Sequence, residues 1–468
     1  MNKRLNIILL LILFLFPSFI FAQNKYNITF KIHGIEDSVV YIKTIYGNNQ
    51  FIIDTLKKEK DGTFVLKKDN IHQGMGFVAN KDYEMFAFLF DKSPTFSVEI
   101  DLLWNYQIKG CKDNDLYFEF QRANTLFRNN EKDVKNYIKR NRDKNINLDS
   151  IEIAYNKERR GFIQFQEEFY KNYPSHLMTK MVKALEGPKI PQHFFKGREI
   201  DTSKTAEFVY FFRTNYWNNF DFADNRLIAT PYFFSKLKTY INELTVQQGD
   251  SIGQSLKEFV DLALKYNGKE YAQYAVNYFL TINRKSPFAY NEERFVGIVD
   301  RVVSSETTPW ISPSEIEKLQ IEANEIRPLL PGKQFVNLSE KDLLGNTYNL
   351  YDVKKKYTIV YFWSAGCKSC KENLEAFEKF YSEYKDKYDF EVYSIDLDYN
   401  LEESLAFSKN HPFKWIVLKS DPDIIKQKYN LDIDMTPDLY LLDSEKRIIN
   451  HAPVYSQMEQ TIKSIEKK

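Results

Sequence analysis

Two of the three cysteines in this 468-residue chain, Cys367 and Cys370, are separated only by Lys368 and Ser369. A pair at this spacing can form a redox centre, supply half of a metal site, or act as a structural disulfide. The apolar run YTIVYFW at 357–363 predicts a strand directly before the pair, and a helical pattern follows it. Cys367 is therefore expected at or near the N-terminus of a helix.

A helix N-terminus favours a negative charge, because free backbone N–H groups and the helix dipole point at that end. In such places the pKa of a cysteine falls from about 8.5 to roughly 3.5–7.5, and the adjacent Lys368 adds a positive charge. Cys370 follows one turn later, with its Cα expected roughly 5–6 Å from that of Cys367, within the range of a disulfide. We therefore expect Cys367 to attack a substrate disulfide and Cys370 to resolve the mixed disulfide.

Other uses of the cysteine pair fit the sequence less well. A zinc site needs further ligands close by, but only Cys111 remains and the six histidines are scattered, at positions 33, 72, 176, 193, 411 and 451. Haem attachment needs a histidine after the second cysteine, where Lys371 stands. A permanent disulfide within one turn closes a loop too short to stabilise much. We predict no metal and no organic cofactor, with Cys111 either a small buried residue or a third redox partner.

A proline near the end of the chain supports the redox interpretation. Met435, Thr436 and Pro437 precede the apolar run at 438–442, which predicts a strand. Proline at the start of a sheet strand cannot donate to the hydrogen-bond ladder. Beside a strand, CxxC and helix unit we expect a cis Thr436–Pro437 bond, with an ordinary trans turn as the alternative.

The sequence pattern divides the chain into three parts. Residues 23–111 alternate apolar and polar positions between Gly, Asn and Asp turns, which predicts a β-sandwich domain. Residues 112–326 show helical spacing, as at Leu256, Phe259 and Val260, and predict an α-helical domain. Residues 327–468 alternate predicted strands and helices, so they predict an α/β domain around a mostly parallel sheet.

The N-terminal segment predicts export. Lys3 and Arg4 precede an apolar run at 5–21 that ends at Ala22, the pattern of a signal peptide over residues 1–22. An uncleaved membrane anchor is the alternative. Export predicts a periplasmic location, where disulfides persist. Lys plus Arg total 65 against 64 for Asp plus Glu, so no basic surface for nucleic acid is indicated.

From about Pro331 onward the chain resembles the exported thioredoxin-like proteins of the TlpA/ResA group. The resemblance rests on PGKQFVNLSEKDLLGNTYNL, on VYFWSAGCKSC at the cysteine pair and on MTPDLYLLD at the proline. It implies a C-terminal thioredoxin fold with Cys367 and Cys370 as the catalytic, disulfide-forming pair. It also implies that Trp363 flanks the site and binds substrate, with core packing as the alternative, and that Thr436 and Pro437 face the disulfide and bind substrate. Thr436 would then offer backbone groups to an extended substrate segment.

Several positions depart from that group. Gly366 replaces the tryptophan that is common before the first cysteine, and Asn373 stands where a glutamate is common. Tyr361 stands where thioredoxin has a buried acid, and Val360 where a peroxiredoxin has proline. The carboxylate that handles the proton is therefore not identified. Three acids are candidates for that role, and each can instead be a solvated charge: Glu372, Asp396 and Asp398.

These observations indicate an exported thiol-disulfide oxidoreductase that acts on envelope proteins. The resemblance implies protein disulfide or dithiol substrates and a membrane-bound electron donor or acceptor. The parts before residue 327 resemble uncharacterised domains that precede such modules in some Gram-negative bacteria. The alternative is an envelope binding protein whose thioredoxin module is regulatory or accessory, because those parts make up most of the chain.

Overall fold

The computed structural model describes residues 25–101, 105–141, 149–197, 199–284, 286, 288–433 and 435–467. The predicted signal peptide at 1–22 lies outside these residues. The chain divides into two compact units, Met1–Thr239 and Tyr240–Lys468. No helix in the described part of the chain is long and apolar enough to cross a membrane.

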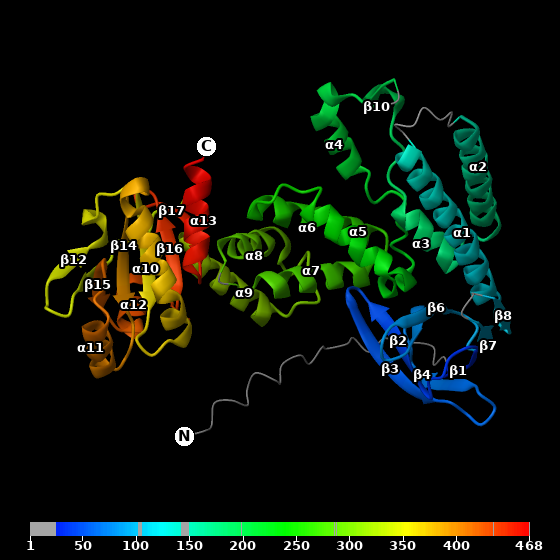
Figure 1. The fold of residues 1–468 in the computed structure, drawn as a ribbon, viewed down its shortest axis with the longest axis horizontal. Coiled ribbons are helices and arrows are strands. Elements are labelled where there is room, and N and C mark those ends of the chain that lie inside the picture. Colours follow the sequence, from blue (N-terminus) through cyan, green and yellow to red (C-terminus); the bar gives the residue numbers. More distant parts are fainter. Residues whose placement is uncertain are drawn as a thin grey trace. The chain divides into compact units, whose positions relative to one another are not determined.

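The first unit begins with two four-stranded sheets, with strand orders β4-β1-β7-β8 and β3-β2-β5-β6 (Figure 1). In β1 every second side chain, from Tyr26 to Ile32, is buried, because alternate side chains of a strand point to opposite faces. The two sheets meet through aromatic rings: Phe88 lies 5.1 Å from Phe30 and 6.4 Å from Phe96. The predicted β-sandwich is confirmed. The strands are β1 Lys25–Ile32, β2 Val39–Tyr46, β3 Asn49–Lys57, β4 Phe64–Asp69, β5 Gly74–Ala79, β6 Glu84–Phe90, β7 Thr95–Ile100 and β8 Tyr106–Lys109.

A helical region follows these sheets, as predicted. Helix α6 buries Leu256, Phe259 and Val260, the residues whose spacing predicted it. The boundary between the two compact units falls inside α5, so α6 to α9 belong to the second unit with the α/β region. The elements are α1 Lys112–Asn141, α2 Asp149–Asn172, α3 Leu177–Leu185, β9 Phe195–Lys196, β10 Glu199–Ile200, α4 Thr205–Thr214, α5 Pro231–Asn242, α6 Gly249–Lys265, α7 Lys269–Asn283, α8 Ala289–Val302 and α9 Pro313–Ile326.

Helices α6 and α8 pack with their backbones in contact. Gly249 and Gly253 of α6 face α8, and Gly297 of α8 faces α6. A Cβ atom added at any of these positions would overlap a backbone carbonyl oxygen of the other helix. Because only glycine lacks a Cβ, these three positions allow the close approach and define where α8 lies.

The rest of the second unit is built on a seven-stranded sheet with the order β12-β11-β15-β14-β13-β16-β17 (Figure 1). Only the three central strands β15, β14 and β13 pair in parallel; the outer pairs are antiparallel. The prediction of a mostly parallel sheet is therefore wrong. Short hairpins make β11–β12 and β16–β17 antiparallel, and β11–β15 and β13–β16 are antiparallel as well. The strands are β11 Ser339–Lys341, β12 Thr347–Asn349, β13 Tyr357–Trp363, β14 Phe390–Asp396, β15 Ile416–Lys419, β16 Asp438–Leu442 and β17 Ile448–Ala452, and the helices are α10 Lys368–Tyr388, α11 Leu401–Asn410, α12 Pro422–Tyr429 and α13 Tyr455–Ile465.

Strand β13 carries the cysteine pair at its end. All seven of its residues are buried, and they alternate between the two faces of the sheet. Ile359 and Tyr361 pack in the core that α10 and α13 cover, whereas Val360 and Phe362 pack in the core that α12 covers. Packing on both faces fixes the end of β13, where the chain turns into α10. The predicted C-terminal α/β domain is confirmed.

Gly297→Ala is expected to destabilise the second unit, because the new methyl group overlaps the carbonyl oxygen of Gly249. We expect a loss of about 1–3 kcal/mol, the usual cost of overpacking, measured as a lower midpoint of thermal unfolding. Gly161→Ala is the matched control, since nothing lies within 4 Å of a Cβ there and alanine is the better helix former. Equal midpoints for Gly297→Ala and wild type would show that α6 and α8 do not meet at these glycines.

Candidate active site

Cys367 and Cys370 form a disulfide at the junction of β13 and α10. Their Cα atoms lie 5.3 Å apart, within the expected range. Cys367 is partly exposed, whereas Cys370 is only 2% exposed and packs in the core under α10. An approaching thiol can therefore reach the sulfur of Cys367 but not that of Cys370.

Cys367 is the N-cap residue of α10, as its position in the sequence predicted. Its backbone is extended, and its sulfur accepts a hydrogen bond from the backbone N–H of Cys370 at 3.1 Å. The hydroxyl of Ser369 lies 3.4 Å from the same sulfur. After reduction, these groups and the helix dipole stabilise negative charge on this sulfur. The cation of Lys368 contributes little, because its side chain is 89% exposed and pairs with Glu372.

The Thr436–Pro437 peptide bond is cis, as predicted. The carbonyl oxygen of Thr436 lies 3.3 Å from the sulfur of Cys367. Strand β16 begins at the next residue, Asp438, which pairs with Phe362 of β13. The sheet therefore brings the proline turn and the disulfide together, although 69 residues separate Cys367 from Thr436.

Trp363 lies in the core and not on the surface around the disulfide. Its side chain is 1% exposed, and its ring packs against Phe407 at 5.5 Å and Phe413 at 5.1 Å. The prediction that Trp363 contacts substrate does not fit this burial, because no substrate can reach the indole. The alternative, core packing below the site, is the one the structure shows.

Asp398 ties the loop before Cys367 to the end of β14. Its carboxylate accepts hydrogen bonds from the hydroxyl of Ser364 at 2.7 Å and from the N–H of Gly366 at 2.6 Å. Partial burial acts to raise the pKa of Asp398, but the hydrogen bonds from Ser364, Asn400 and Gly366 outweigh it and hold the pKa below its usual range. Asp398 is therefore an ionised anchor of this loop, a role that the sequence did not reveal.

The other two acids proposed for proton handling lie in different surroundings. Asp396 is 2% exposed and accepts hydrogen bonds from the N–H groups of Ala365, at 3.4 Å, and Asp398, at 2.9 Å. It is buried, so its interpretation as a solvated charge is wrong. The side chain of Glu372 is 60% exposed and lies 3.6 Å from Lys368, as expected of a solvated charge.

A small depression lies beside the cis-proline where thioredoxin has its buried acid. Tyr361 occupies that place, and burial raises the pKa of its hydroxyl above the usual value, so it remains neutral. Asn373 donates from its amide to the carbonyl oxygen of Ser369 at 2.8 Å. None of the residues lining the depression is an acid; they are Tyr361, Asn373, Phe377, Pro437, Leu439, Pro453, Val454 and Tyr455.

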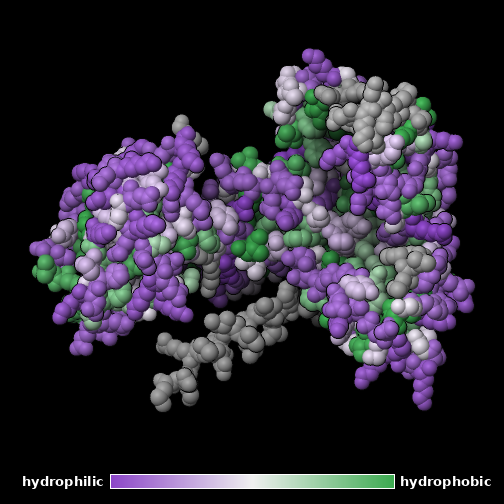
Figure 2. Space-filling model, viewed as in Figure 1, coloured by the Kyte–Doolittle hydropathy of each residue, from purple (hydrophilic) through white to green (hydrophobic). Residues whose placement is uncertain are grey.

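Exposed apolar side chains flank the two loops of the site, although hydrophilic residues dominate the molecular face shown in Figure 2. Met435, next to the cis-proline turn, is 60% exposed. Tyr399 and Leu401, which follow the anchor residue Asp398, are 70% and 53% exposed. Apolar side chains in water beside a reactive group are suited to contacting another protein.

Cys111, the third cysteine, is a free thiol with 4% exposure. Its sulfur lies 3.3 Å from the side-chain amide of Asn114 and 3.5 Å from the N–H of the same residue. The prediction of a small buried cysteine is confirmed. In the described part of the chain, no group of three or more His, Cys, Asp or Glu side chains is arranged to hold a metal ion.

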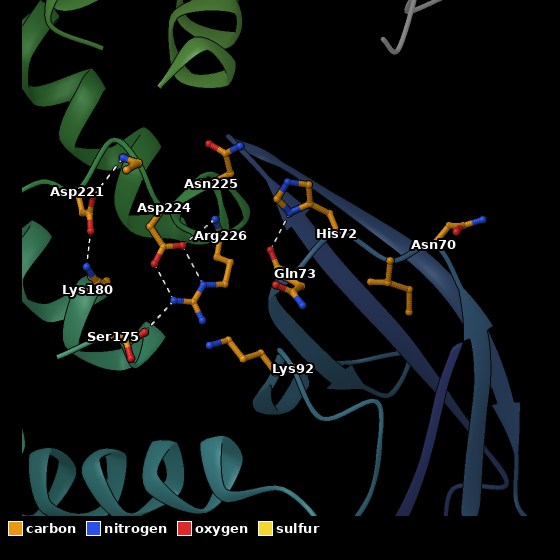
Figure 3. A pocket seen from close by; sticks show the side chains of 12 residues that line it. Asn70, His72, Gln73, Lys92, Ser175, Lys180, Asp221, Asp224, Asn225 and Arg226 are labelled. Carbon is orange, nitrogen blue, oxygen red and sulfur yellow. Dashed lines mark hydrogen bonds and ion pairs between the residues drawn. The ribbon is translucent and has the colours of Figure 1, made fainter. Parts of the chain in front are cut away.

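The first unit contains a separate cavity of about 520 Å³ between the β-sandwich and the helical region (Figure 3). In Figure 3 the guanidinium of Arg226 points toward Asp224 and toward the carbonyl oxygen of Ser175, which lies 2.9 Å away. Lys180 pairs with Asp221 on the same side. These four charged side chains of the cavity wall are therefore paired with one another.

Two parts of the chain match protein families. Residues 331–451 match the AhpC/TSA family, and residues 166–327 match a domain of unknown function, DUF5106. The thioredoxin-like protein YneN of Bacillus subtilis (strain 168) is 30% identical over 140 residues, which cover 29% of this chain and 77% of YneN.

Two solved structures resemble parts of the chain. A thioredoxin-like protein from Bacteroides caccae is 19% identical and covers 59% of this chain and 97% of its own, with a TM-score of 0.45. A domain of a possible thiol-disulfide isomerase from Cytophaga hutchinsonii is 32% identical and covers 30% of this chain and 95% of its own, with a TM-score of 0.27.

Asp398→Asn is expected to lower the unfolding midpoint of the second unit by about 2–4 °C at pH 7, because the loop loses a charged hydrogen-bond acceptor. Since the folded-state pKa of Asp398 is depressed, its contribution is present above the unfolded-state pKa of about 3.9 and is lost as the pH falls through the lower folded value. Calorimetry at a series of pH values should show the two midpoints converging below about pH 4. Glu372→Gln is the control for an exposed carboxylate and should change little. A difference that is the same at every pH would contradict the anchoring role.

Proposed function

Because the chain belongs to the thioredoxin-like proteins, we propose that it is a thiol-disulfide oxidoreductase whose reacting sulfurs are those of Cys367 and Cys370. The proposal depends above all on one observation: one sulfur is accessible at the head of α10, and its partner is buried one turn below it. Such a pair can react with a substrate sulfur and then close on itself.

In the reducing direction, the thiolate of Cys367 attacks one sulfur of a substrate disulfide. A bond forms between Cys367 and that sulfur, and the other substrate sulfur leaves as a thiolate and takes up a proton. The thiolate of Cys370 then attacks the sulfur of Cys367 and releases the second substrate thiol. Two electrons pass to the substrate and the Cys367–Cys370 disulfide remains. The oxidising direction reverses these steps, starting from attack by a substrate thiolate on Cys367.

The surroundings of the disulfide favour a protein substrate. The cis-proline turn presents Thr436 next to Cys367, so an extended client segment can pair with its backbone groups. The exposed side chains of Met435, Tyr399 and Leu401 supply apolar contacts on either side. We assign client binding to Thr436 and Pro437, and not to Trp363.

We further propose that the protein works in the periplasm, on envelope proteins, as a member of the TlpA/ResA type. The predicted signal peptide supports export, and the MTPDLYLLD and VYFWSAGCKSC stretches support the type. Sustained reduction in an oxidising compartment requires an electron donor, and a membrane-bound dithiol protein is the class of partner that supplies it. An oxidase would instead require an acceptor of the same class.

A binding protein is the second candidate function. The cavity of about 520 Å³ in the first unit has the size of a small-molecule site and lies far in sequence from Cys367 and Cys370. In this case the thioredoxin module is accessory, and the cysteines are dispensable for the main activity.

Insulin reduction with dithiothreitol as the electron source separates these candidates. We expect the full chain to accelerate reduction well above the dithiothreitol background, and Cys367→Ser to return it to background because the attacking sulfur is gone. In a separate incubation without dithiothreitol, pre-reduced Cys370→Ser is expected to accumulate a client joined to Cys367, visible as a larger species on a non-reducing gel and removed when reductant is added. Equal, negligible turnover by wild type and Cys367→Ser would instead favour the binding protein.

Cleavage of the signal peptide is expected after Ala22, so that the mature protein begins at Gln23. The intact mass of the protein from the periplasmic fraction measures this directly. A mass that retains residues 1–22, in the membrane fraction, would establish the uncleaved anchor instead.

A further inference from the structure

A buried group of charges lies directly behind the cis-proline turn. His451 of β17 is 5% exposed, and its two ring nitrogens each contact a carboxylate: Nε2 lies 2.6 Å from Asp438, and Nδ1 lies 2.8 Å from Glu292. The imidazole also stacks on the ring of Tyr440, with the ring centres 4.1 Å apart. Both carboxylate side chains are 13% exposed.

The ring of His451 is positively charged at neutral pH. Burial acts to lower the pKa of His451, but the carboxylates of Asp438 and Glu292 outweigh it and raise the pKa to about 10. Both N–H groups of the ring therefore donate, and each carboxylate accepts one hydrogen bond. A buried cation with both donors satisfied fixes the two carboxylates relative to each other, because an unpaired donor or charge there would be costly.

The two carboxylates come from different parts of the second unit. Asp438 directly follows Pro437, and the preceding residue, Thr436, places its carbonyl oxygen against Cys367. Glu292 lies in the first turn of α8, 159 residues before His451, in the region that matches the domain of unknown function. The contacts thus run without a break from a helix of that region to the reacting sulfur.

We propose that Glu292 is a positioning residue for disulfide exchange: through His451 it holds Asp438, and with it the Thr436–Pro437 turn, in the place where a client segment binds. This inference rests on the proposed function. The helical region then supplies part of the client-binding apparatus and is not a separate appendage. The Gly249, Gly253 and Gly297 contacts support this role, because they hold α8, the helix that carries Glu292, against α6.

Kinetics of the full chain with two oxidants tests the role: steady-state turnover of a peptide disulfide with dithiothreitol as the electron source, and a single turnover of the pre-reduced protein with 5,5′-dithiobis(2-nitrobenzoate). Glu292→Ala leaves Nδ1–H of His451 without its acceptor, so we expect the KM for a disulfide-containing peptide to rise about five- to tenfold with kcat within twofold, a loss of binding of about 1–1.4 kcal/mol. The rate with 5,5′-dithiobis(2-nitrobenzoate), which has no peptide backbone to pair with Thr436, should stay unchanged. Glu292→Gln keeps an oxygen acceptor and should restore most of the KM.

Glu322→Ala is the matched control, because it also breaks an ion pair of the second unit, that of Glu322 with Arg284 at 2.8 Å, but one outside the contacts that lead to Cys367. Hydrogen exchange adds a readout that needs no turnover: residues 435–442 should exchange faster in Glu292→Ala but not in Glu322→Ala. Unchanged exchange in this segment, or the same rise in KM in both variants, would overturn the proposal. If wild type reduces neither oxidant while exchange changes as expected, the proposed function fails but the coupling of Glu292 to the turn stands.

Discussion

The hydrogen bond between the N–H of Cys370 and the sulfur of Cys367 is the interaction on which the candidate site depends. It makes a sulfur atom the cap of α10, so the atom that reacts also satisfies a free donor of the helix. This geometry requires that α10 start after only a short loop at the end of β13. The strand is buried on both faces. The carboxylate of Asp398 holds the connecting loop by accepting hydrogen bonds from the hydroxyl of Ser364 and the N–H of Gly366. A core strand, a carboxylate and a helix terminus together place one sulfur at the surface.

The parts of this arrangement that follow from local pattern could be predicted from the sequence. The apolar run of β13, the spacing of the cysteines and the proline before β16 each carry their signal within a few residues. The contacts that complete the site do not. Asp398 lies more than 30 residues from Ser364 and Gly366, and no periodicity marks such a pair. Trp363 was ambiguous for a related reason: an aromatic residue that ends a core strand can face solvent or core, and the positions of Phe407 and Phe413 decide between them.

The sheet and the compact units show the same limit. Alternating strands and helices indicated an α/β region, but strand direction depends on connection length, and the hairpins at both edges of the sheet make its outer strands antiparallel. The change from helices to strands near residue 327 lies where the two family matches, 166–327 and 331–451, adjoin, and the domain border predicted there stays a prediction. Helices α6 to α9 nevertheless pack in one compact unit with the thioredoxin-like sheet. The charged contacts of His451 contribute to this packing, because they join α8 of the helical region to β16 and β17 of the sheet.

The burial of Cys111 makes the chain a convenient reporter of its own redox state. In the folded, oxidised protein the described chain offers a bulky thiol reagent no accessible sulfhydryl, because Cys111 is buried and the other two sulfurs are bonded to each other. After reduction we expect the reagent to reach Cys367, which is partly exposed in the oxidised protein, and not Cys370, which is buried. One adduct on the intact protein therefore marks a reduced molecule. The fraction of labelled protein, measured by mass in a series of thiol-disulfide buffers of known potential, gives the midpoint potential without any mutation.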